Sequence, residues 1–143
     1  MKSTKSESAN FIQINRYLTS AQHRVANARK VIRIDEQTGF QMAYDAMLRA
    51  SLALLLSVGM RPRSTLGHHK VIIEEVDKVI GKPSYRAIMS YFDMMRRKRN
   101  EALYEPLSTI TEKEAHEAID TAQTFLTMIR REIQLKNPQQ KLL

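Results

Sequence analysis

Apolar residues recur along most of the chain at alternating steps of three and four, which is the spacing of one face of an α-helix. No segment shows the strict apolar–polar alternation that is typical of a half-buried strand. Glycines, prolines and short polar runs separate the periodic stretches, as expected for helix ends and turns. The pattern predicts helices over about residues 8–34, 40–58, 68–80, 84–104 and 111–134.

The second predicted helix is apolar around nearly its whole circumference between Leu52 and Leu56, so we expect it to be the most buried. Four long helices and one short one, joined by brief connections, predict an all-α protein, an antiparallel four-helix bundle with one short extra helix. We expect residues 1–143 to form one domain with frayed ends at about 1–7 and 136–143. At helix N-termini the sequence predicts capping boxes at Thr38–Gln41 and Thr111–Glu114 and a first-turn proline at Pro83. At helix C-termini it predicts glycines just after the helix at Gly59 and Gly81 and a proline that ends the helix at Pro106.

The composition is that of an ordinary folded protein, with 43% hydrophobic and 27% charged residues. The absence of cysteine excludes disulfides, thiolate metal sites and cysteine nucleophiles, and suits a reducing compartment. The first ten residues are polar and do not resemble a signal peptide, and the apolar stretch at 50–60 is too short to span a bilayer. We therefore expect a soluble, cytoplasmic protein without a membrane partner.

The formal charge of +8, from 23 Lys and Arg against 15 Asp and Glu, favours polyanionic partners such as RNA, DNA or an acidic protein. A solvated basic surface without a specific partner remains the alternative. The chain has no H-E-x-x-H motif, no Gly-rich phosphate loop and no G-x-S-x-G elbow. These absences argue against a metallohydrolase or an NTPase, and we expect neither a cofactor nor a metal.

One charged residue interrupts the apolar face of the predicted helix at 84–104. That face, read at steps of three and four, consists of Tyr85, Ile88, Phe92, Met95, Arg99 and Ala102. A guanidinium on a packing face is costly unless it is paired or lines a cleft. Arg99 therefore requires an explanation, whereas we expect Arg96, Arg97 and Lys98 to lie around the rest of the helix in contact with water.

Two segments resemble the HEPN-domain superfamily. Residues 52–69, L-A-L-L-L-S-V-G-M-R-P-R-S-T-L-G-H-H, resemble the end of its second helix and the following loop. Residues 96–105, R-R-K-R-N-E-A-L-Y-E, resemble the stretch that carries its R-x(4–6)-H motif, which often begins Arg-Asn. The resemblance covers most of the chain, from about Phe40 to Ile129, and includes the helix order.

The resemblance implies an all-α homodimer. In catalytic members two copies of the motif meet across the interface and form a metal-independent endoribonuclease site. Many members are toxins or antiphage-defence effectors, with an antitoxin or a nucleotidyltransferase as a possible partner, while others lack the motif and bind RNA or proteins. By position Arg99 matches the motif arginine and Asn100 the polar residue after it, but Tyr104 stands where the histidine is expected.

Cleavage of RNA needs a base for the 2′-hydroxyl, an acid for the leaving oxygen and a cation for the phosphate charge. Arg99 suits the last role, because its planar fork matches two phosphate oxygens. Tyr104 is a poor base at its ordinary pKa of about 10, unless two Arg99 side chains across a dimer axis lower that pKa. We therefore predict Arg99, Asn100 and Tyr104 as the catalytic residues of an endoribonuclease. The alternative is a degenerate module that binds RNA or a protein through a basic cleft.

Each of these residues also has a structural interpretation. Arg99 could pair with Glu101, with Glu105 or with an acid on another helix, Asn100 could serve as a plain polar contact, and Tyr104 could pack on a dimer partner. A third interpretation is an antitoxin or scaffold role, in which the stripe from Tyr85 to Met95 is a protein interface and no nucleic acid is involved.

Five further residues are predicted to bind nucleic acid: Arg96, Arg97, Lys98, His68 and His69. The first three would contact phosphates, or else form a solvated face. The two histidines are adjacent and point roughly 100° apart on a helix, so they do not form a metal-binding pair. They could cap a helix or pack on a loop, or one of them could reach the cleft and replace the missing motif histidine.

Overall fold

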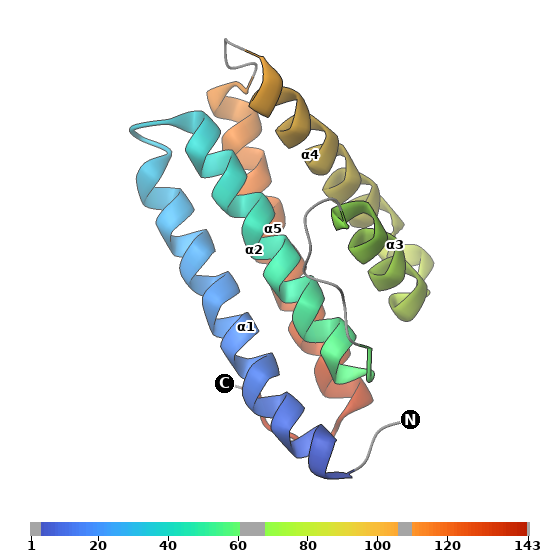
Figure 1. The fold of residues 1–143 in the computed structure, drawn as a ribbon. Coiled ribbons are helices and arrows are strands. Elements are labelled where there is room, and N and C mark those ends of the chain that lie inside the picture. The colour runs from blue at the N-terminus through green and yellow to red at the C-terminus, as the bar shows by residue number, and fades with distance from the viewer. Residues whose placement is uncertain (1–3, 61–67, 106–109, 143) are drawn as a thin grey trace.

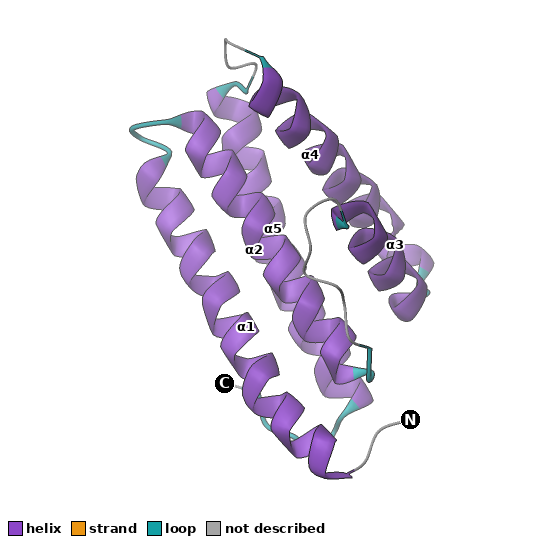
Figure 2. Cartoon of the chain, in the orientation of Figure 1, coloured by secondary structure: helices purple, strands orange, loops and turns teal. Residues whose placement is uncertain are grey.

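The computed structural model describes residues 4–60, 68–105 and 110–142. Within these ranges every regular element is helical, and Figure 2 shows that helices make up most of the described chain. The elements are α1 (Thr4–Val31), α2 (Glu36–Ser57), α3 (His69–Ile80), the short 3-10 helix η1 (Pro83–Tyr85), α4 (Arg86–Tyr104) and α5 (Glu112–Lys136).

The four long helices alternate in direction along the chain, and the shorter α3 lies beside α4 (Figure 1). Helix α2 packs against each of the other α-helices, so it occupies the centre of the bundle. This arrangement confirms the predicted all-α bundle with one short extra helix.

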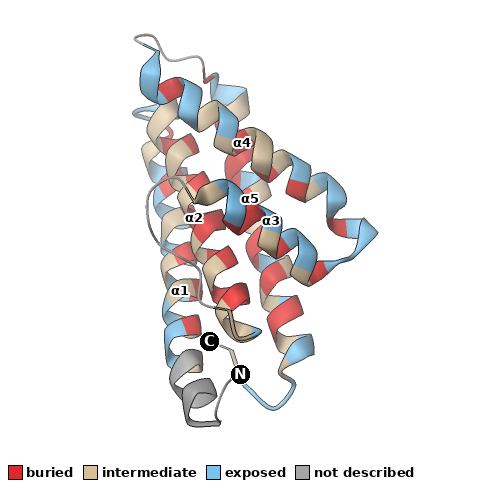
Figure 3. Cartoon of the chain, turned by 45° about the vertical axis from the view of Figure 1, so that its right-hand side comes forward, coloured by how far each residue is buried: buried red, intermediate tan, exposed pale blue. Residues whose placement is uncertain are grey.

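The central helix is also the one with the most buried side chains in the described chain, as the sequence predicted. Its buried positions run from Gly39 to Leu55 and include Tyr44, Met47 and Leu54. Figure 3 shows the buried positions of the helices gathered on the sides that face one another. One continuous apolar core therefore joins all the α-helices, and burial of this area supplies most of the stability.

One of the two predicted capping boxes forms. Thr111 accepts a hydrogen bond from the backbone N–H of Glu114, whose carboxylate accepts one from the backbone N–H of Thr111. The predicted box at Thr38 is wrong, because Asp35 caps α2 instead by accepting from the backbone N–H of Gln37. The hydroxyl of Thr38 donates to the same carboxylate. Helix α2 therefore begins four residues earlier than the predicted Phe40.

Most other boundaries differ from the predictions by a few residues. Helix α1 begins before Ser8, and Pro83 starts a 3-10 turn that precedes α4 rather than the first turn of α4 itself. Gly81 has φ of 58° and ends α3, and Gly59 has φ of 92° just after α2, as expected for glycines beyond helix C-termini. The predicted loop beyond Met60 and the stop at Pro106 lie outside the described residues.

A candidate functional site around Arg99

Three helices bring Tyr44, His69 and Arg99 together in the bundle. Tyr44 lies on α2, His69 is the first residue of α3, and Arg99 lies near the end of α4. The guanidinium carbon of Arg99 is 5.7 Å from the centroid of the Tyr44 ring. The hydroxyl of Tyr44 is 3.1 Å from Nδ1 of His69, and the two ring centroids are 5.7 Å apart. We call these three residues the Arg99 cluster.

The three cations that precede Arg99 each have a carboxylate partner. Nε of Arg96 is 2.9 Å from Oδ1 of Asp93, and Nε of Arg97 is 3.5 Å from Oδ2 of the same residue. Nζ of Lys98 is 3.0 Å from Oε2 of Glu114 on α5. Much of the basic run is thus neutralised within the chain.

Arg99 differs from its neighbours, since no carboxylate of the described residues forms an ion pair with it. Its Nη1 donates a long hydrogen bond of 3.5 Å to the side-chain oxygen of Asn100. Glu101 and Glu105, the acids that could have paired with it, are both exposed. Arg99 is therefore a half-buried residue whose guanidinium lies over the ring of Tyr44 and has no carboxylate beside it among the described residues.

The expected exposure of the basic run is correct only in part. The side chain of Arg97 is 64% exposed, whereas that of Arg96 is only 16% exposed. Arg96 lies beside Asp93 and close enough to Tyr44 to influence the pKa of that phenol, which places it toward α2 rather than in water. Lys98 is also mostly covered, because it reaches α5. Arg97 is thus the most open phosphate-binding candidate of these three.

Tyr44 is the member of the cluster that the sequence analysis missed. It is only 1% exposed, and it packs edge-on against Phe92, which in turn packs edge-on against Phe125. Burial raises the pKa of Tyr44 well above its ordinary value of 10, although the charge of Arg99 opposes the shift, so the phenol keeps its proton. The available signal was a tyrosine inside the helix predicted to be most buried, since a buried phenol usually has a polar partner.

His69 is half-buried beside Tyr44. Burial lowers the pKa of His69 below its ordinary value of 6.5, and the positive charges of Arg99 and Arg96 lower it further, while Asp45 opposes them. The imidazole is therefore neutral at neutral pH. The capping interpretation is wrong for both histidines, because His68 occupies the N-cap position of α3 without a side-chain hydrogen bond and His69 packs on Tyr44.

The remaining predicted catalytic residues lie at the surface. Asn100 is exposed and adjoins Arg99. Tyr104 is 87% exposed at the last position of α4. It follows Arg99 by five positions, which turns it roughly 140° around the helix. The fold therefore brings Asn100 to Arg99 but does not bring Tyr104 there.

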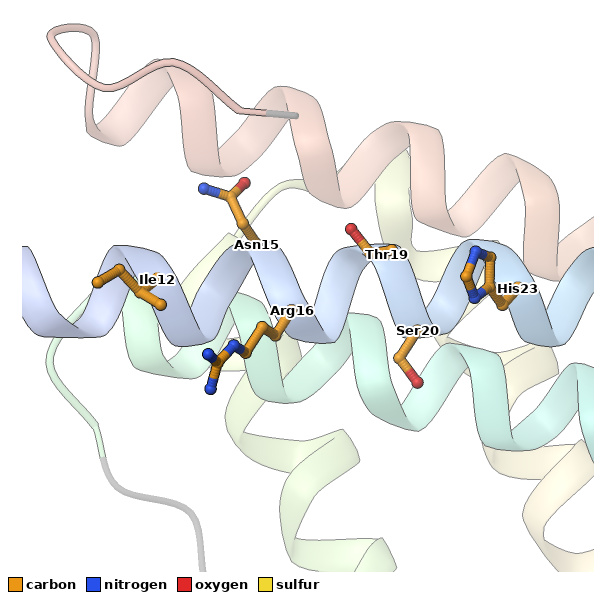
Figure 4. Close-up of a pocket in the computed structure, with 6 residues that line it drawn as sticks. All are labelled: Ile12, Asn15, Arg16, Thr19, Ser20 and His23. Carbon is orange, nitrogen blue, oxygen red and sulfur yellow. The ribbon is translucent and has the colours of Figure 1, made fainter.

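A separate hollow runs along α1, far from these residues in the sequence. The side chains that line it all come from this helix, as Figure 4 shows: Ile12, Asn15, Arg16, Thr19, Ser20 and His23. None of the predicted site residues lines this hollow, and it does not change the assignment of the candidate site.

A sequence model of the HEPN domain matches residues 14–133, which is most of the chain. The chain belongs to the HEPN family. A comparison with curated proteins finds no match.

The HEPN match includes all three residues of the Arg99 cluster. His69, the histidine that lies beside Tyr44, belongs to α3, whereas Arg99 belongs to α4. In the part of the chain that the structure describes, no three His, Cys, Asp or Glu side chains are grouped so that they could hold a metal ion. No helix of that part is both long and apolar enough to cross a membrane.

Proposed function

We propose that this HEPN protein is a metal-independent endoribonuclease in which Arg99 binds the scissile phosphate. The observation that carries the proposal is that Arg99 is a half-buried residue whose guanidinium has no carboxylate partner among the described residues. A partly desolvated cation is stabilised by an anion, and a guanidinium fits two oxygens of a phosphate at once. An arginine in this state can stabilise the charge that develops on phosphorus during cleavage.

The overall charge supports a polyanionic substrate. With a formal charge of +8 the chain attracts RNA over a distance of about one Debye length, roughly 8 Å at physiological salt. Arg97 is mostly exposed on the helix that carries Arg99. It is suited to contact a neighbouring phosphate and thus to align the strand over Arg99.

The proposed site forms across a homodimer. Leu103 follows Arg99 by four positions, which places it on the same side of α4, and it is 53% exposed next to the exposed Tyr104. A second copy that covered this end of α4 would bury both side chains and bring two Arg99 residues toward one another. Tyr104 would then contribute to the site of the partner or to the interface.

An endoribonuclease without a restraint stops growth. We therefore assign the protein to the toxins or antiphage-defence effectors, with an antitoxin or a nucleotidyltransferase as the partner that restrains it. Induced expression that leaves growth unaffected would contradict this role.

The second candidate function is RNA binding without cleavage. It is favoured by one specific observation, the tyrosine at position 104 where catalytic members of the family have histidine. In that case Arg99 would hold a phosphate without any proton transfer.

Cleavage of a labelled single-stranded RNA in the presence of EDTA separates the two functions. We expect the wild type to cut the RNA and Arg99→Ala to be slower by ~100-fold or more. Arg29→Ala is the matched control, because Arg29 is a partly exposed arginine on α1 that pairs with Asp120. RNA that binds but stays intact at high protein concentration would leave only the binding function.

A further inference from the structure

We infer that His69 is the general base of the proposed ribonuclease and that Tyr44 is the residue that positions it, in place of a histidine at position 104. The inference rests on the proposed function, and it assigns the proton transfer to a different helix from the one that carries the motif arginine. Helix α3 then contributes the base and α4 the phosphate-binding cation.

The shared contact with Tyr44 carries the inference. The guanidinium carbon of Arg99 and the ring centroid of His69 each lie 5.7 Å from the centroid of the Tyr44 ring. The separation of the two groups therefore cannot exceed the sum of those distances. A cation for the phosphate and a base for the adjacent 2′-hydroxyl are thus held on one buried side chain.

The hydrogen bond of His69 uses Nδ1 and fixes the orientation of the ring. Nδ1 lies 3.1 Å from the hydroxyl oxygen of Tyr44, which is its hydrogen-bond partner among the described residues. When the N–H of Nδ1 donates to that oxygen, Nε2 retains its lone pair and is available as a base. In this tautomer Tyr44 has the role that a carboxylate or a carbonyl has beside other catalytic histidines, without adding a negative charge.

The charges around the ring keep it ready to accept a proton. Tyr44 and Asp45 face it from α2, and Arg96 and Arg99 face it from α4. Burial and the two arginines lower the pKa of His69, and Asp45 opposes them only in part. The neutral, basic form of the imidazole therefore persists to lower pH than for an ordinary histidine.

The proposed step is an internal transesterification. Nε2 of His69 takes the proton of the 2′-hydroxyl as its oxygen attacks the adjacent phosphorus, and the bond from phosphorus to the 5′-oxygen breaks. The leaving oxygen takes a proton from solvent, and the imidazolium later returns its proton to solvent. The products are a 2′,3′-cyclic phosphate and a 5′-hydroxyl, and no redox change or metal is needed.

Other titratable residues fit this role less well. Tyr104 is turned roughly 140° around α4 from Arg99, and the histidine that bonds and packs against Tyr44 is His69 rather than His68. His23 is on α1 and His116 pairs with Glu112 on α5.

The test is the rate of metal-free RNA cleavage as a function of pH for the wild type, His69→Gln, His68→Gln and His23→Gln. We expect the wild-type rate to rise with pH and then level off, and His69→Gln to be slower by roughly 100-fold or more and to lose that rise. His23→Gln, on a different face of the bundle, should retain both the rate and the profile. Tyr44→Phe should lower the rate less than His69→Gln does and should shift the pH profile. In this variant the imidazole of His69 stays in place but loses the hydroxyl that orients it.

The outcomes separate this inference from the proposed function. A wild-type enzyme that cuts RNA, together with a His69→Gln variant that cuts as fast, would overturn the role of His69 and leave the ribonuclease intact. A slow His68→Gln variant beside a normal His69→Gln variant would move the base to the neighbouring residue. A wild type that never cuts RNA would overturn both proposals.

Nuclear magnetic resonance of the histidine rings adds a measurement that does not depend on activity. We expect the His69 ring to carry its proton on Nδ1 and to titrate below the ordinary histidine pKa of 6.5, and Arg99→Gln to raise the pKa of His69. A proton on Nε2 in the neutral ring would overturn the proposed base.

Discussion

The guanidinium of Arg99 lies over the ring of Tyr44, with 5.7 Å between its central carbon and the ring centroid. Such a contact attracts the cation by about 0.5 to 2 kcal/mol, and it leaves the formal charge in place. A carboxylate in the same position would compete with a phosphate for the guanidinium. Tyr44 therefore holds Arg99 and keeps it available to an anion.

Substitutions at Tyr44 should separate the hydroxyl from the ring. Tyr44→Phe keeps the ring under Arg99 and loses the hydrogen bond to His69, so we expect the free energy of unfolding to fall by about 1 kcal/mol. Tyr44→Leu also removes the contacts with Arg99 and Phe92, and we expect a loss of roughly 2 to 4 kcal/mol. Urea denaturation measures both losses, and equal losses would show that the contacts of the ring with Arg99 and Phe92 add nothing to the stability.

A buried carboxylate on α5 should make the stability of the protein depend on pH. Glu132 is buried, with Nζ of Lys82 at 2.6 Å and the hydroxyl of Tyr85 at 3.1 Å from its Oε2. Burial by itself raises the pKa of Glu132, but the bonds from Lys82 and Tyr85 and the charges of Lys82 and Lys136 lower it below the ordinary 4.5. The stabilising contribution is thus fully present above that ordinary value and is lost as the pH falls through the lowered pKa.

Glu132→Gln tests this dependence. At neutral pH we expect the variant to lose about 1.5 to 3 kcal/mol of unfolding free energy, because it loses hydrogen bonds to a charged group. The difference from the wild type should shrink in acid, where the wild-type carboxylate is protonated. Glu117→Gln on the exposed side of α5 is the control and should change little. A difference for Glu132→Gln that is the same at every pH would contradict the assignment.

Affinity for RNA should fall steeply with salt and depend on Arg97. This side chain is mostly exposed, so Arg97→Glu should weaken binding, and Arg97→Gln should reduce the slope of log affinity against log salt by roughly one. Lys30→Glu on the exposed side of α1 makes the same change in net charge and should have a smaller effect. Equal effects of the two reversals would mean that only the net charge matters.

The proposed dimer should depend on the exposed end of α4. We expect Leu103→Asp and Tyr104→Asp to give monomers in light scattering, because a buried carboxylate would be unpaired in the interface. Leu135 on α5 is also exposed, and Leu135→Asp should leave the dimer intact. A wild-type protein that is monomeric at high concentration would exclude a site that is shared between subunits.

The sequence predicted the helices well because helical spacing is a local property. It placed the capping box at Thr111 correctly, but it chose Thr38 over Asp35, two residues that both carry a side chain able to cap a helix. It also singled out Arg99 correctly as a cation on a packing face.

The Arg99 cluster itself could not be derived from spacing. Tyr44 and His69 are 25 positions apart on different helices, and their contact depends on how α3 docks on α2. The covered position of Arg96 beside Asp93 likewise follows from packing, since a run of basic residues alone predicts only a solvated face.

The most direct test of the account is the single-turnover rate of metal-free RNA cleavage by Arg99→Ala, compared with that of Arg29→Ala, both at saturating protein. Both variants replace an arginine by alanine. Arg29 is paired with Asp120, whereas Arg99 has no acidic partner among the described residues. We expect Arg99→Ala to be slower by ~100-fold or more. Equal rates for the two variants would contradict this expectation.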